Sequence, residues 1–405
     1  SVSMDMFGRI AEGTSMSFTI FHVSYALFLG SFFIHKIIRN DFQLRIPPLS
    51  LMFCLLFVWI CFSILYSPAR IPALILFIRI IFLFIYYICI YNLDLTMKKI
   101  KLFIGFIGFN IIAISLHNLY TIMGFSMAQI MMDRLNPMGK ITRLGGLFEN
   151  VNNFAILIIT FIIIILSVVF LSKIKFKNKI ILLMTTLPVF GALVFTFTRS
   201  VPLILMCSLF VIYLQSPYKR IFHVFIILFL STIGALYFFS GFIQTYVNRI
   251  TGLLTGEIDF SAMTRLNLLL TGIKGGFENF WFGLGFKGFP EYFQSHMPHS
   301  HILWEVFESH NILVTYFSEL GIIGVSLILM IFISYFIYHY SRIKKMKQSV
   351  LKAVYTGFFL CSFQYILFFQ FEPKHLNMSV FWLFCGIVFS IQYHIDNKLI
   401  LPEDE

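Results

Sequence analysis

The chain has 405 residues, of which 59% are hydrophobic and only 12% are charged. Soluble proteins carry about 25% charged residues, so this composition excludes a soluble enzyme and indicates an all-α polytopic membrane protein. The formal net charge of +12 reports membrane topology more often than nucleic-acid binding, because lysine and arginine collect in cytoplasmic loops. We expect one membrane domain over residues 1–405 and no nucleic-acid partner.

Apolar segments long enough to cross a bilayer recur along the chain. A transmembrane helix needs about 20 mostly apolar residues. Eleven segments approach this length, near residues 15–35, 48–66, 71–92, 101–120, 152–172, 180–197, 201–216, 221–242, 311–340, 353–371 and 378–395. The pattern predicts about 11–12 transmembrane helices.

The links between these segments predict the side of the membrane that each one faces. Lysine-rich links alternate with the others, and the positive-inside rule makes them cytoplasmic. The C-terminus is then cytoplasmic and, with eleven spans, the N-terminus is external. The remaining links face outward, at residues 67–70, 121–150, 198–200, 242–310 and 372–377. The longest predicts a large, partly helical loop on the outer side over residues 243–310, because so much polar sequence cannot lie within the hydrocarbon region.

Arginine predominates among the basic residues of the outer side. The cytoplasmic links contain 14 lysines and 4 arginines, whereas the outer side contains 4 lysines and 7 arginines. These seven are Arg9, Arg70, Arg134, Arg143, Arg199, Arg249 and Arg265. Topology alone predicts no preference for arginine, but bidentate binding of phosphate or carboxylate does. The arginines of the outer face therefore predict an anion-binding site. Alternatively, these arginines pair with outer carboxylates such as Glu149, Glu257, Asp259 or Glu278.

Polar side chains at the outer ends of two spans are candidates for this site. Arg199 occupies a hairpin of a few residues between two spans, where a charge is costly without a partner. Arg143 precedes Asn150, Asn152 and Asn153 at the start of another span. Helix capping explains one asparagine, and the remaining amides suit the hydroxyl groups of a sugar.

Three further arginines lie elsewhere. Arg249 and Arg265 belong to the long outer loop, and the sequence around Arg265 predicts a short amphipathic helix on the outer surface. Arg79 lies at the middle of a span, where a charged residue is a functional candidate by default. Alternatively, Arg79 has a structural pair with a backbone carbonyl or a polar side chain.

His310 is the main titratable candidate, because histidine changes charge near neutral pH. It opens a long span, with Asn311 beside it and Glu319 further inside the same helix. Glu319 has an alternative interpretation as a structural carboxyl that is buried and paired with an arginine such as Arg79 or Arg199.

Two sequence patterns resemble cofactor-binding motifs but do not predict a cofactor site. His296, His299 and His301 are spaced in a way that imitates metal ligands, but Pro298 interrupts any regular helix and no HExxH motif is present. Residues 283–288 match GxGxxG without the preceding strand of a dinucleotide site. These glycines instead predict a tight turn beside the membrane. We expect no metal and no cofactor.

Four sequence pieces between Arg143 and Leu329 occur in a distinctive order. They are Arg143-Leu-Gly-Gly-Leu-Phe-Glu-Asn-Val-Asn152-Asn, then Thr198-Arg199-Ser200, then Arg265 followed by Gly276 and Phe282-Gly-Leu-Gly-Phe, then His310-Asn311 followed by Glu319-Leu-Gly321-Ile-Ile-Gly324. In this order and on one predicted face, they resemble the O-antigen polymerase (Wzy-type) and O-antigen ligase (WaaL-type) superfamily of bacterial inner-membrane glycosyltransferases. The chain departs from that pattern in two ways: a first span is apparently missing, and a long segment over residues 121–142 precedes the first motif.

The resemblance implies a GT-C-like fold and, as donor, an oligosaccharide linked through diphosphate to undecaprenol in the outer leaflet of the inner membrane. By this resemblance Arg199 and Arg265, with Arg143 third, bind the diphosphate at a site facing the periplasm. His310 either activates the acceptor hydroxyl or binds the diphosphate. A single displacement without a metal predicts inversion at the anomeric carbon. Membrane lipid and a chain-length regulator protein are further expected partners.

The motifs fit two related activities. A polymerase joins repeat units on one lipid carrier, whereas a ligase moves the finished polymer onto the lipid A core. The phenylalanine- and isoleucine-rich helices and the asparagine-rich residues 149–153 favour the polymerase by resemblance. A lipid-linked-glycan transporter is a third class, but it requires polar residues along several spans, and here they concentrate on the outer side.

Overall fold

The computed structural model describes residues 20–40, 43–122, 151–196, 198, 200–220, 222–223, 260–296, 308–372 and 375–399. Every regular element in these residues is an α-helix, which confirms the expected all-α class. The helices are α2 (Ile20–Ile38), α3 (Ser50–Ile64), α4 (Arg70–Tyr91), α5 (Met97–Ile122), α6 (Val151–Leu171), α7 (Phe176–Phe195), α8 (Ser200–Gln215), α11 (Phe260–Glu278), α12 (Phe289–His296), α13 (Ile312–Lys345), α14 (Val350–Phe368) and α15 (Ser379–Asp396).

Ten of the eleven expected spans correspond to helices, namely α2 to α8 and α13 to α15. The span expected near residues 221–242 lies outside the described residues except for Phe222 and His223. Within the described residues, seven helices are long and apolar enough to cross a membrane: α4, α5, α6, α7, α13, α14 and α15. Shorter apolar helices occur within α2, α3 and α8. The chain is therefore a multi-pass helical membrane protein.

Helix α6 is the most deeply buried of the candidate membrane spans in the described residues. Its isoleucine-rich sequence is buried on nearly all sides, as expected for a helix that is apolar all round. It packs against α14, α7 and α8. The approach to α14 is close at Gly357, where an added Cβ would lie 3.2 Å from the Cα of Ile164. Small residues permit such close contacts between membrane helices.

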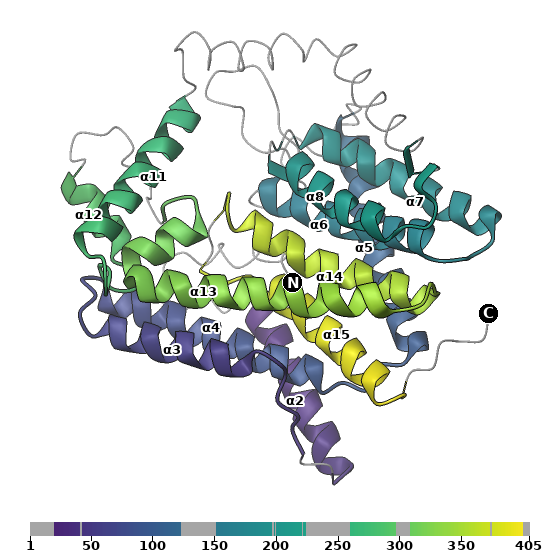
Figure 1. Cartoon of the computed structure of the whole chain (residues 1–405), viewed down its shortest axis with the longest axis horizontal. Helices are drawn as coiled ribbons and strands as arrows, with labels where there is room; N and C mark the ends of the chain where they lie inside the picture. The colour runs from purple at the N-terminus through teal and green to yellow at the C-terminus, as the bar shows by residue number, and fades with distance from the viewer. Residues whose placement is uncertain are drawn as a thin grey trace.

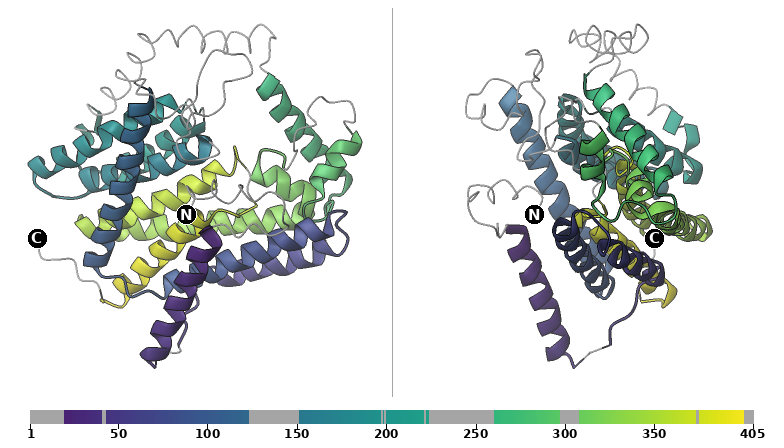
Figure 2. Two further views of the ribbon diagram at one scale, coloured as in Figure 1. Left: turned by 180° about the vertical axis from the view of Figure 1, so that it is seen from behind. Right: turned by 90° about the vertical axis from the view of Figure 1, so that its left-hand side faces the viewer.

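The other helices pack in pairs, some of them close in sequence and some distant. Helix α14 contacts α15, α15 packs on α4, α3 packs on α13, and α13 packs on α11. Figures 1 and 2 show α3 alongside α13, with α11 and α12 gathered at one end of these helices. The last turn of α13, which contains Arg342, Lys344 and Lys345, lies at the opposite end (Figure 1). The basic end of α13 is thus separated from the end that carries α11 and α12.

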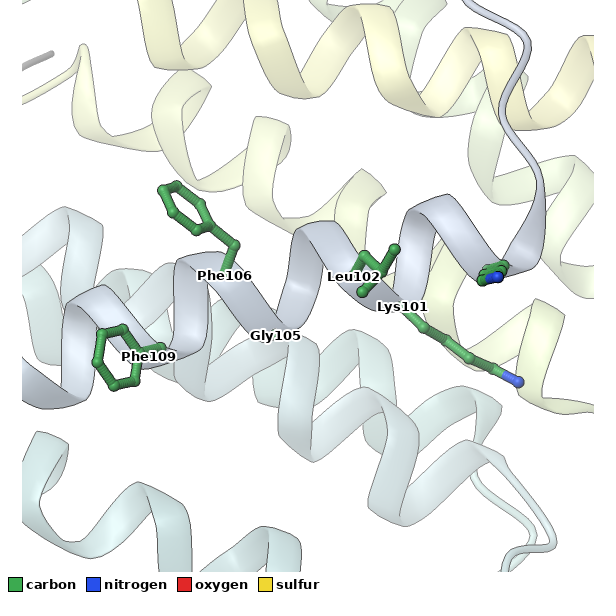
Figure 3. A pocket seen from close by; sticks show the side chains of 6 residues that line it. Lys101, Leu102, Gly105, Phe106 and Phe109 are labelled. Carbon is green, nitrogen blue, oxygen red and sulfur yellow. The ribbon is translucent and has the colours of Figure 1, made fainter.

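A shallow depression runs along the surface of α5 (Figure 3). Its lining residues are Lys98, Lys101, Leu102, Gly105, Phe106 and Phe109. All six belong to one helix, and the rings of Phe106 and Phe109 are largely exposed, as expected for a helix face that meets lipid. This depression shares no residue with the polar cluster described next.

Candidate functional site

A break in α13 forms one side of the candidate site. The helix is interrupted at Gly321, whose φ of 66° and ψ of −166° are not helical. The break leaves carbonyl oxygens without their helical partners, and the preceding Gly-rich turn supplies donors to them. The backbone N–H of Leu284 donates to Ser318 O at 2.8 Å, and that of Gly285 donates to Glu319 O at 2.9 Å. Backbone groups at membrane depth must be satisfied in this way within the protein.

The turn over residues 283–285 requires glycine. Gly283 and Gly285 have φ values of 73° and 88°, which side chains with a Cβ rarely adopt. A Cβ on Gly283 would lie 2.4 Å from the carbonyl carbon of Glu319, and a Cβ on Gly285 would lie 2.5 Å from the Cα of Ser67. The predicted tight turn is therefore confirmed, and it serves to bring its backbone into contact with α13 and the end of α3.

His310 and Asn311 form the turn that starts α13. Asn311 Oδ1 accepts from the backbone N–H groups two and three residues further on, at 2.9 and 3.1 Å, and so caps the helix. Asn311 Nδ2 donates to Gln370 O at 3.3 Å, and Ile312 N donates to Phe369 O at 3.0 Å. The turn is thus tied to the segment that follows α14. His310 adopts a left-handed conformation with φ 60°, which is uncommon for a residue with a Cβ.

The carboxylate of Glu372 joins residues from three other parts of the chain. Asn152 Nδ2, in the first turn of α6, donates to Glu372 Oε1. Arg265 Nη2, on α11, lies 3.9 Å from the same oxygen. Glu372 also acts electrostatically on His310. Two of the residues predicted from the sequence, Asn152 and Arg265, are therefore brought together at one carboxylate, and its charge acts on a third, His310.

The surroundings of His310 favour its neutral form. Burial is the largest cause and lowers the pKa of His310 from its usual 6.5. The charge of Glu372 opposes this effect and raises the pKa, whereas the charge of Arg265 lowers it further. Nδ1 is buried and has no hydrogen-bond partner among the described residues. A neutral imidazole with an unoccupied ring nitrogen can accept a proton or a hydrogen bond.

Glu319 is completely buried, and its partner is a histidine. Its Oε2 accepts from Lys287 N at 2.9 Å and lies 2.8 Å from His375 Nε2. Among the described residues its ion-pair partner is therefore His375, which the last outer link places beside α13, and not Arg79; the alternative pairing with Arg199 falls on a residue outside them. Burial by itself lowers the pKa of His375, but the charges of Glu319 and Glu308 outweigh it and raise the pKa to about 9.

The remaining predicted residues divide into two groups. Arg143, Asn150, Arg199 and Arg249 lie outside the described residues, although α7 and α8 end and begin close to Arg199, as the expected short hairpin requires. Asn153 and Arg79 are described. Asn153 Oδ1 and Arg79 Nε are buried and have no hydrogen-bond partner among the described residues. Arg79 belongs to α4, which packs mainly on α15 and α3.

Sequence reasoning did not select Glu372 or His375. The available signal was the short outer link over residues 372–377, which contains an acid, a lysine and a histidine within a few positions. Nothing in the sequence connects this link with α6, α11 or α13. The two residues become recognisable only when the end of α14 is packed beside the start of α13.

These features define a class of protein: a multi-pass helical membrane protein with a cluster of arginine, glutamate and histidine where several helices end. Comparison with protein families is more specific. Residues 184–329 match the family model Wzy_C, described as O-antigen ligase. This match confirms the resemblance to the O-antigen polymerase and ligase superfamily over that stretch. No curated protein matches the chain significantly.

The matched stretch contains much of the candidate site, but not all of it. Arg199, Arg265, His310 and Glu319 lie within residues 184–329. Asn152, Glu372 and His375 lie outside them and approach through the fold.

Proposed function

We propose that this chain is a bacterial O-antigen polymerase. It would transfer a glycan linked to undecaprenyl diphosphate onto an acceptor hydroxyl of another lipid-linked repeat unit, in the outer leaflet of the inner membrane. The observation that carries this proposal is that Asn152 and Arg265 meet at the carboxylate of Glu372, whose charge acts on His310 at the start of α13. The family match over residues 184–329 supports the same class of reaction.

Arg265 is suited to the diphosphate of the donor. Its side chain is 49% exposed and contacts Glu372 through one terminal nitrogen at 3.9 Å, so further N–H donors of the guanidinium face solvent. A planar guanidinium can bind two phosphate oxygens at once. Arg199 and Arg143 are proposed to join it. Loss of one such fixed donor commonly costs about 3–4 kcal/mol of transition-state stabilisation.

His310 is suited to activate the acceptor. In the proposed displacement the acceptor oxygen forms a bond to the anomeric carbon while the bond from that carbon to the diphosphate oxygen breaks. The hydroxyl proton passes to the imidazole of His310, and undecaprenyl diphosphate leaves. The charge of Glu372 favours the imidazolium that forms. A general base of this kind contributes about 10²–10⁴-fold to the rate, and one displacement inverts the anomeric carbon.

A ligase is the second candidate, because the matching family carries that description. Deletion of the gene in its host distinguishes the two. Lipopolysaccharide that carries a single repeat unit supports the polymerase. Full-length polymer that accumulates on undecaprenyl diphosphate, with an uncapped lipid A core, contradicts the polymerase and supports the ligase.

Reconstitution provides the direct test. Purified protein in liposomes, supplied with lipid-linked repeat units alone, should produce a ladder of longer lipid-linked glycans. Absence of elongation at every donor concentration, followed by transfer when lipid A core is added, would exclude the polymerase.

A further inference from the structure

A buried histidine connects the two segments that carry the candidate site. The side chain of His375 has no exposed surface and lies between two carboxylates. Its Nδ1 is 2.7 Å from Glu308 Oε1, and its Nε2 is 2.8 Å from Glu319 Oε2. The rings of Phe286 and Tyr316 pack on it, with centroid distances of 5.2 and 6.0 Å.

With both carboxylates ionised, this geometry requires a charged imidazole. Ionised carboxylates only accept hydrogen bonds, so both ring nitrogens must donate, and only the doubly protonated ring has two N–H donors. Lys287 Nζ lies 3.4 Å from Glu308 Oε1 and supplies a second cation. Two carboxylates then face two cations, as a buried charge cluster requires.

The cluster adjoins the candidate site on both sides. Glu308 precedes His310 by two residues, and His375 follows Glu372 by three. Glu319 lies just before the break at Gly321. The imidazole of His375 thus joins the segment that carries His310, the segment that carries Glu372, and the broken helix itself.

We propose that His375 is a positioning residue: it bridges Glu308 and Glu319 and thereby fixes the positions of His310 and Glu372 relative to α13. The consequence for catalysis rests on the proposed function, but the consequence for local order does not. His375 itself need not contact the substrate.

The charge of His375 gives this bridge a pH limit. Because its pKa in the fold is raised from 6.5 to about 9, the stabilisation is fully present below 6.5 and is lost as pH rises through about 9. The charged or titratable groups that face it are Glu308, Glu319, Lys287 and Tyr316. Local order around residues 308–320 should decline over the same pH range.

The first measurement uses the wild-type protein without any substrate. Side-chain ¹⁵N NMR in lipid nanodiscs, assigned by comparison with His375→Gln, should show a doubly protonated histidine at neutral pH that titrates near pH 9. A neutral His375 at neutral pH would overturn the proposal.

The second measurement reads local order by hydrogen exchange. In His375→Gln, the peptide over residues 308–320 should exchange faster than in the wild type. The matched control is His394→Gln, a buried histidine near the end of α15 that contacts Ser390 O; it should leave that peptide unchanged. Equal protection in wild type and His375→Gln would contradict the bridge.

The third measurement is kinetic. Misplacement of catalytic groups by about 1 Å can cost about 10²-fold in rate, so His375→Gln should lower kcat by at least about tenfold, with a smaller change in KM. His375→Lys, which keeps the charge, should recover part of kcat and move the alkaline limb to higher pH. Wild-type kcat in His375→Gln would refute the positioning role. If the wild type elongates no glycan, the proposed function is wrong. The NMR and hydrogen-exchange measurements then still test whether His375 bridges Glu308 and Glu319.

Discussion

Asn152 and Glu372 are separated by 220 positions in sequence and share a hydrogen bond where α6 begins and α14 has ended. Arg265 approaches the same carboxylate from α11. The contact explains why an asparagine follows the start of α6 without being its cap. It also makes Glu372 the residue through which three separate helices meet.

The first prediction concerns Glu372→Gln. The amide keeps the shape of the side chain but removes the charge that raises the pKa of His310. That pKa should fall further, so the acid limb of the pH–activity profile should move to lower pH. Maximal polymerisation should fall about tenfold or more, because the imidazolium is no longer stabilised. A pH–rate profile measured on reconstituted protein checks both effects.

The control for this change is Glu278→Gln. Glu278 is a carboxylate on α11 that pairs with Lys274 and Tyr292. Glu278→Gln should leave the pH–activity profile unchanged. An unshifted acid limb in Glu372→Gln would show that Glu372 does not act on the catalytic base.

The second prediction concerns Arg265. Arg265→Lys keeps the charge but loses the planar fork that binds two phosphate oxygens. Polymerisation should fall by about 10²-fold, in line with a lost donor of about 3 kcal/mol. Lys274→Ala, on the same helix, is the matched control and should retain activity. Near-complete glycan chains from Arg265→Lys, measured at equal expression, would argue against bidentate phosphate binding.

The third prediction concerns the break in α13. Gly321→Ala places a Cβ 2.4 Å from Trp281 O on a backbone with φ 66°. The clash and the unfavourable φ should destabilise the fold by about 1–3 kcal/mol or more. Thermal unfolding in detergent should show a clearly lower Tm. Gly105→Ala on α5 has open space around the added Cβ and should match or exceed the wild-type Tm, because alanine favours a helix. Similar Tm values for the two variants would refute a strained break.

The fourth prediction separates capping from substrate binding at Asn311. Asn311→Asp keeps the oxygen that accepts from the first turn of α13, whereas Asn311→Ala loses it, at a cost of about 1 kcal/mol. If the cap contributes more than the hydrogen bond from the amide to Gln370 O, which Asn311→Asp removes, this variant should retain most of its stability and activity. Strong loss of donor affinity in Asn311→Asp, at unchanged Tm, would instead assign the amide to the substrate.

The sequence predicts several residues of the candidate site but does not assign a role to each. Asn152 and His310 are candidates because each is polar at the predicted end of an apolar segment, and Arg265 because it belongs to the arginine-rich outer side. Glu319 is a further candidate from the sequence, and its alternative interpretation is a structural pair with an arginine; the partner among the described residues is His375. A carboxyl inside a helix does not indicate which distant loop will cover it.

What the sequence determined by itself was the class of fold. Lipid leaves no water for backbone groups, so long apolar segments such as α4, α6 and α14 must be helices, whatever they pack against. The tight turn at Gly283 and Gly285 follows equally from local backbone freedom. The tertiary structure alone decided that this turn docks on the break at Gly321, and that Glu372 and His375 complete the site. These pairings depend on which segments lie side by side, and burial then dictates that each carboxylate finds a cation or an N–H donor.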